Sequence, residues 1–202
     1  GGTNAGDSFT GTDAENNTLF GYDAGTAITT GDNNTGIGSG ALKAVTTASQ
    51  NVAIGKEALK TITTNNNQVA VGTHALRLLT DGYSNTAVGH YTGAVLTTGG
   101  YNSLFGQEAG AALTTGSWNT VVGHQALDAN TTGAQNTAVG SQAGGANTTG
   151  SYNAYFGRQS GQKNTTGEQN TAIGAYALVE NTTSIESTAI GYGALMNATG
   201  AN

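Results

Sequence analysis

Apolar and polar residues recur along this chain with a period of 17 residues. Before each repeat glycine stands a triplet of the type Thr-Ala-Val, which is apolar or β-branched and typical of a short strand rather than a helix. The glycines are spaced by 17 residues without insertion or deletion: Gly21, Gly38, Gly55, Gly72, Gly89, Gly106, Gly123, Gly140, Gly157, Gly174 and Gly191. A register kept over eleven copies indicates units that stack on one another. We therefore expect an all-β fold, a β-solenoid or β-roll of stacked 17-residue coils.

Each copy is numbered here from 0, at the Asn that precedes the triplet. Position 2 is apolar or small and position 3 is large and apolar, so both faces of the expected strand look buried. A thin coil has one interior, so the second face predicts a partner surface and, we expect, a homotrimer. We assign the structural core to the position-3 column: Phe20, Ile37, Ile54, Val71, Val88, Phe105, Val122, Val139, Phe156, Ile173 and Ile190.

Two departures from the repeat bear on packing. Copies with Phe at position 3 have Gly at position 8, whereas copies with Leu at position 8 have Val or Ile at position 3. This exchange of volume predicts that positions 3 and 8 touch, within one coil or across a chain interface. Position 11 changes from Ile, Val or Leu to Asn at Asn130, Asn147, Asn164 and Asn181. Either the cross-section changes there or position 11 becomes exposed.

The chain divides into two stretches. Residues 17–202 are eleven repeats that form one continuous solenoid shaft. Residues 1–16 match the repeat poorly, since Asn4 stands where a repeat glycine is expected, and they are either a degenerate first coil or a junction. The last copy stops one residue short of completion, so we expect a segment of a longer protein.

Composition narrows the function classes. Only 9% of residues are charged, as expected where like side chains stack in columns about 4.8 Å apart and Asn and Thr hydrogen-bond along them. A net charge of −6 with six basic residues argues against nucleic-acid binding. No apolar run approaches the roughly 20 residues of a membrane helix, so no membrane insertion is expected. The chain has no cysteine, which removes disulfides and thiol catalysis.

The phrase Asn-Thr-Ala-Val/Ile-Gly-x-x-Ala-Leu-x-x-Asn-Thr-Thr-Gly, followed closely by residues 119–133 and 170–184, resembles the repeats of bacteriophage tail fibres. It is also similar to the coils of trimeric autotransporter adhesin heads, which are left-handed parallel β-rolls in trimers. The resemblance covers about 185 residues. It implies a fibre shaft, extracellular or on a virion surface, that presents a tip to a cell-surface glycan or receptor.

No candidate catalytic site, metal site or cofactor emerges. His90 and His124 share position 5 two copies apart, about 10 Å along the stack, which is too far to share a metal. We expect a non-enzymatic structural protein. The alternative is a monomeric ice- or glycan-binding solenoid that uses the Thr columns at positions 12 and 13 or an aromatic column. Sugar contact is a hypothesis for Tyr101, Trp118 and Tyr152 at position 16, where ordinary rim packing is the competing interpretation.

Overall fold

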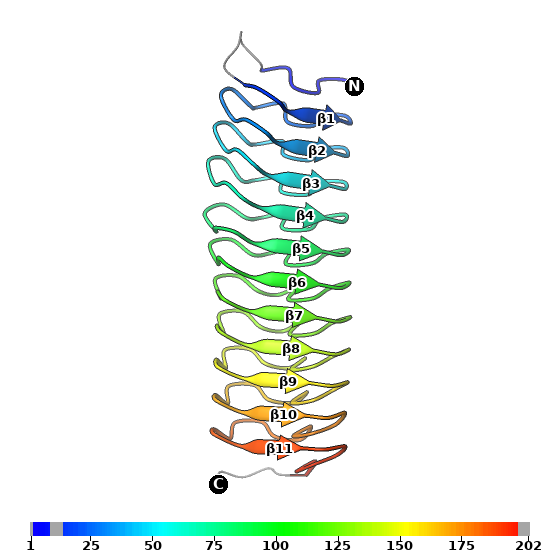
Figure 1. Cartoon of the computed structure of the whole chain (residues 1–202), viewed down its shortest axis with the longest axis vertical. Coiled ribbons are helices and arrows are strands. Elements are labelled where there is room, and N and C mark those ends of the chain that lie inside the picture. Colours follow the sequence, from blue (N-terminus) through cyan, green and yellow to red (C-terminus); the bar gives the residue numbers. More distant parts are fainter. Residues whose placement is uncertain (1, 9–13, 198–202) are drawn as a thin grey trace.

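The computed structural model describes residues 2–8 and 14–197 as a parallel β-solenoid. Each coil from residue 17 onward contributes one three-residue strand, all eleven strands point the same way, and the return segments run behind them (Figure 1). The strands are β1 (Thr18–Phe20), β2 (Thr35–Ile37), β3 (Val52–Ile54), β4 (Val69–Val71), β5 (Thr86–Val88), β6 (Ser103–Phe105), β7 (Thr120–Val122), β8 (Thr137–Val139), β9 (Ala154–Phe156), β10 (Thr171–Ile173) and β11 (Thr188–Ile190). The all-β solenoid expected from the repeat is confirmed.

The strands form one parallel sheet in which each pairs with the next in the chain. Paired residues are 17 apart throughout, as in Val121 opposite Ala138 and Val122 opposite Val139. The turn after each strand needs the repeat glycine, because φ there lies between +121° and +142°, a region that residues with a Cβ rarely enter. In every coil but the last, an added Cβ would also overlap the backbone of the next coil's glycine. Stacking therefore explains why this glycine never varies.

The core lies between the strands and the return segments. It is built from positions 2, 7, 8 and 11, and its fully buried members include Ala138, Ala126, Leu127 and Leu113. The assignment of the core to position 3 is wrong for the single chain. Eight of those eleven side chains are 37–69% exposed, and Val71, Val88 and Val139 are half-buried. Successive strand residues face opposite ways, so the side chain at position 2 points into the thin interior, where it is Ala in most coils, and the side chain at position 3 points outward.

The covariation with position 8 reflects a contact to position 2. An added Cβ at Gly25 or Gly110 would meet Leu19 or Leu104, and one at Gly161 would overlap the Tyr155 ring. A large residue at position 2 also excludes Leu from position 8 of the preceding coil. Gly93 faces Leu104 in this way and Gly144 faces Tyr155. Where position 2 is Ala, as in β10, Leu178 fills the same space. The predicted contact between positions 3 and 8 does not occur within a coil, because their side chains lie on opposite faces of the strand.

A buried Asn ladder at position 0 ties neighbouring coils together. The Asn119 side-chain Oδ1 accepts the backbone N–H of Asn136 at 3.0 Å, while its Nδ2 donates to the Gly133 carbonyl at 3.0 Å. The same pair of contacts recurs along the stack, and Gln68 preserves it with its longer amide. Buried amides that satisfy backbone groups in this way stabilise one register. The Asn ladder inferred from composition is confirmed.

Position 11 stays buried in both halves of the chain. Leu113 and Asn130 are each 1% exposed, so exposure does not explain the change to Asn. The Asn130 amide accepts the N–H of Gly133 and donates to its carbonyl, both at 3.0 Å, and so closes the turn from inside. In β9's coil, Asn164 also donates to the Tyr155 hydroxyl at 2.7 Å. Polar turn closure thus replaces apolar packing at this position.

In the first coil the repeat register is shifted by two residues, which the sequence pattern did not reveal. Gly2, rather than Asn4, lies against Gly21, and Gly6 donates its N–H to the Ala24 carbonyl as position 8 does elsewhere. Asn4 takes the place of position 6, with φ +58° and a hydrogen bond from Nδ2 to Asp23. Glu15 is already back in the regular register. The first coil is therefore two residues longer than the rest.

Candidate functional site

An uncharged surface runs along the whole sheet, and we call it the outer strand face and define it as the side chains at positions 1 and 3 of β1–β11. The residues at position 1 are all small or medium-sized and uncharged. They are Thr18, Thr35, Val52, Val69, Thr86, Ser103, Thr120, Thr137, Ala154, Thr171 and Thr188. Position 3 adds the exposed Phe, Ile and Val column. None of these positions holds a charged residue in any coil. At about 4.8 Å per coil and about 12 Å across, the face covers roughly 600 Å².

Such a face lies at the upper end of what an isolated chain exposes. The largest apolar patch on a typical monomer is about 300–600 Å² and is often functional. Depletion of charge is characteristic of the centre of protein interfaces. The chain's charged side chains lie instead on the turns and return segments, where Asp23 pairs with Lys43 at 2.9 Å and Lys163 pairs with Glu180 at 2.6 Å. The outer strand face therefore has the composition of an interface.

The Thr columns at positions 12 and 13 do not form a second flat face. At position 12 the hydroxyl donates to the carbonyl of the next coil's Thr, as from Thr114 to Thr131 at 2.9 Å. Position 13 points outward, which leaves a single exposed column such as Thr115 and Thr132. Ice binding calls for two parallel Thr columns. The ladder expected of position 12 is confirmed with Thr29 and Thr46 and with the position-12 Thr residues from Thr80 to Thr165 as donors, while Thr199 lies outside the described residues.

The aromatic column at position 16 is exposed at the turn that precedes the strands. Tyr101 and Trp118 stack with ring centroids 4.2 Å apart and planes 10° apart, and they are 48% and 58% exposed. Tyr152 is 55% exposed and stands two coils further along. The stacked pair uses one face of each ring for its own contact, so only the outer faces are free for a ligand. Sugar contact by these residues stays a prediction.

A cluster of charged and aromatic side chains surrounds Glu57 on the turn after β3. Glu57 lies 3.0 Å from Lys60 Nζ, 3.5 Å from His74 Nε2 and 3.9 Å from Arg77 Nη1. The hydrogen bond from Lys60 lowers the pKa of Glu57. Burial lowers the pKa of His74, and the nearby Glu57 carboxylate opposes that shift. Partly exposed ion pairs of this kind contribute little to stability.

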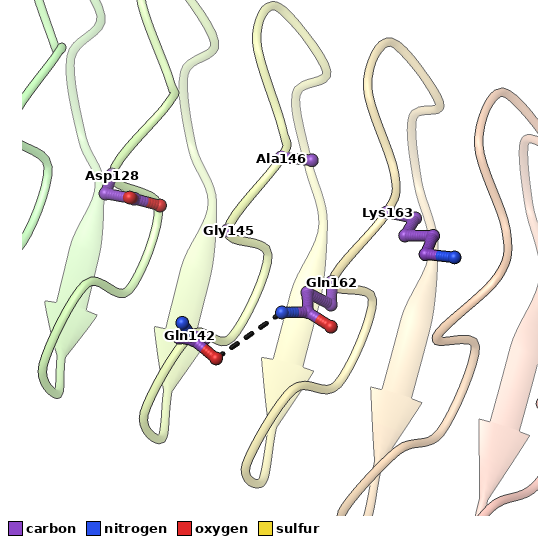
Figure 2. Close-up of a pocket in the computed structure, with 6 residues that line it drawn as sticks. All are labelled: Asp128, Gln142, Gly145, Ala146, Gln162 and Lys163. Atoms are coloured by element: carbon purple, nitrogen blue, oxygen red, sulfur yellow. Dashed lines mark hydrogen bonds between the residues drawn. The ribbon is translucent and has the colours of Figure 1, made fainter.

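A shallow depression of about 340 Å³ lies over the return segments of the coils that follow β7–β9 (Figure 2). It opens because two small residues separate Asp128 from Lys163, and Gln162 donates across it to Gln142 at 3.4 Å. Burial raises the pKa of Asp128, whereas Lys163 is engaged with Glu180. No nucleophile stands beside a base among its six lining residues: Asp128, Gln142, Gly145, Ala146, Gln162 and Lys163.

The histidines lie apart from any metal-binding arrangement within the described coils. His90 and His124 are exposed at position 5, and His90 packs edge-on against Tyr91 with ring centroids 4.4 Å apart. No group of three or more His, Cys, Asp or Glu side chains that could hold a metal ion occurs in residues 2–8 and 14–197. The same residues include no helix long and apolar enough to cross a membrane. No family profile, curated protein or solved structure matches the chain.

Proposed function

We propose that this chain is a shaft segment of a non-enzymatic structural fibre, in which three copies of the solenoid pack side by side through their outer strand faces. The observation that carries the proposal is the uncharged, apolar outer strand face, which runs the length of the sheet. A second copy fits this face because its side chains repeat at the same axial spacing. The number three rests on the resemblance to trimeric adhesin heads.

The fibre's action is mechanical. From β1 to β11 each coil is bonded to the next by strand pairing and the buried Asn ladder, and most coils also by the Thr ladder, so the stack resists bending and local opening. Such a rod holds a binding tip away from a virion or a cell, which places it outside the cell. The tip would meet a surface glycan or receptor. The exposed Tyr101 and Trp118 rings offer a second, lateral sugar contact along the shaft.

The outer strand face also bears on the alternative of a monomeric ice-binding solenoid. Thr at position 1 and Val or Ile at position 3 form two outward columns, as in β8 and β10. The rings of Phe20, Phe105 and Phe156 interrupt this plane, so it does not present a level lattice to ice. Packing against side chains of a partner tolerates such rings. Absence of ice-recrystallisation inhibition by the purified chain is the expected outcome.

Small-angle X-ray scattering tests the proposal. Side-by-side association keeps the particle roughly 50 Å long, the length of eleven coils at about 4.8 Å, and thickens its cross-section. Val122→Asp should give a rod of equal length with the cross-section of one chain. Association would bury the unpaired carboxylate on the covered face, and the cost of removing its water opposes association. Ser141→Ala, on an exposed turn, should leave the thick rod unchanged. A thin rod for the native chain would contradict the proposal.

A further inference from the structure

Self-association through the outer strand face, on which this inference rests, raises the question of axial register. Neighbouring coils have nearly the same backbone and differ by one repeat in height, about 4.8 Å. Two copies that slip by one coil lose only one of eleven contacting layers. The repeated residues distinguish the slipped arrangement from the aligned one only by that one layer. Register must come from residues on this face that break the repeat.

The largest departures on the face are three phenylalanines at position 3. Phe20 in β1, Phe105 in β6 and Phe156 in β9 are 61%, 40% and 40% exposed, whereas the other coils carry Ile or Val there. Contacts within the single chain do not explain these rings, since the residues that pack inside the same coils are Leu19, Leu104 and Tyr155. The rings project from the sheet where a partner would lie.

Their spacing is irregular in an informative way. The phenylalanines are five coils and three coils apart, so the first and last are eight coils apart, and these three separations all differ. In a parallel pair, full alignment brings all three rings opposite their copies. A slip of three, five or eight coils restores one such match, and every other slip restores none. The pattern therefore singles out one register.

We propose that Phe20, Phe105 and Phe156 set the axial register in which copies of this chain associate. Aromatic rings at the same height around a shared axis pack edge to face and fill one another's space. After a slip, a Phe ring lies opposite Ile or Val of the partner. These side chains are smaller than the partner's Phe ring, so part of the volume in that layer stays unfilled. The cost of these mismatches falls on every register except the aligned one. The aligned register is thus selected by three layers out of eleven.

Disulfide trapping tests this inference, because the native chain has no cysteine. Chains carrying Val139→Cys are mixed with chains of distinguishable mass carrying Val122→Cys, which lies one coil away. Disulfides form only between Cα atoms about 4.4–6.8 Å apart. We expect pairs of like cysteines to exceed mixed pairs by about tenfold after correction for mixing, which corresponds to the loss of aromatic contacts on slipping.

The same measurement on a variant with Phe20→Val, Phe105→Val and Phe156→Val should show like and mixed pairs in nearly equal yield. Phe105→Val alone, which keeps two of the three matches, should lie between that variant and the native chain. The matched control is Ile37→Val, Ile54→Val and Ile173→Val, which removes three methylenes from the same column and should keep the native preference. Equal yields in the native background, or a full preference in both Phe variants, would overturn the inference.

Sedimentation of the same samples separates the two proposals. If the native chain sediments as a single copy, self-association fails and the register inference fails with it. If it sediments as an assembly whose register ignores the Phe substitutions, the fibre proposal stands and only the register inference is overturned.

Discussion

The inner and outer faces of each strand are both apolar, yet they differ in what covers them. In β7, Val121 is 1% exposed and its neighbour Val122 is 39% exposed, although the two residues are identical in chemistry. Val121 belongs to the buried core between the strands and the return segments. Val122 lies on a face that the single chain leaves open. The difference shows that an apolar column can serve either the core of one chain or the contact between chains.

Matched aspartate substitutions separate the two faces and should give the largest effect. Val121→Asp buries an unpaired charge in the core and should destabilise the fold by more than about 4 kcal/mol. Val122→Asp should leave the single-chain fold intact, because its carboxylate can reach water in the unassociated chain. Circular dichroism during thermal unfolding measures both. Equal loss of structure in the two variants would contradict the assignment of inside and outside.

Breaking the inner Asn ladder should have the next largest effect. Asn119→Ala removes the acceptor for the Asn136 N–H and the donor to the Gly133 carbonyl, both buried. Two unsatisfied groups correspond to a loss of about 2–5 kcal/mol. Urea unfolding of the variant measures this. Gln135→Ala, on an exposed turn, is the control and should change stability little.

The volume exchange inside the coil predicts a compensating pair. Tyr155→Ala should cost about 3–5 kcal/mol because it leaves a cavity. Gly161→Leu should also destabilise, because its side chain would overlap the Tyr155 ring. The double variant recreates the pairing of Ala172 with Leu178 in the next coil, so it should be more stable than either single variant. A double-mutant cycle by urea unfolding that gave simple additivity would contradict this packing.

The charged edge should show the smallest effect. The pKa of His74 is lowered in the fold from its ordinary value of 6.5, so the unfolded chain binds the proton more readily. The contribution of this residue to stability is therefore fully present above pH 6.5 and is lost as the pH falls from 6.5 through the lower pKa of the folded chain. Between pH 7.5 and 5.5, the melting temperature of the native chain should therefore drop more than that of His74→Gln. An equal drop in both proteins would rule out this contribution.

Much of the fold could be predicted because the eleven copies of the repeat can be compared with one another position by position. The strict spacing of the glycines identified a stacked β-solenoid, and the Asn and Thr columns identified the ladders. The choice of face could not be made in the same way. In most copies position 3 is larger than position 2, and size favoured it as core, but the interior is already filled by residues such as Leu127 and Leu113. The path of the return segment decides which face of the strand Leu127 and Leu113 cover, and the residue pattern does not reveal that path.

Two local features, the partner of position 8 and the role of Asn at position 11, could not be decided from the sequence. The partner of position 8 was ambiguous because Phe at position 3 always follows a large residue at position 2, as in Leu104-Phe105 and Tyr155-Phe156. The Asn at position 11 was compatible with either a changed cross-section or exposure, and the structure shows instead that Asn130 turns back to bond Gly133 in a buried turn. The sequence Asn-Thr-Thr-Gly is a signal for such a turn.

The native mass of the chain, measured by light scattering on the eluting peak, tests the central claim most directly. The account predicts about three times 20.0 kDa, because the outer strand face is covered by other copies of the chain. A mass of 20.0 kDa across the working concentration range would mean that this face stays open to solvent. That result would contradict the fibre proposal and favour a monomeric binding solenoid.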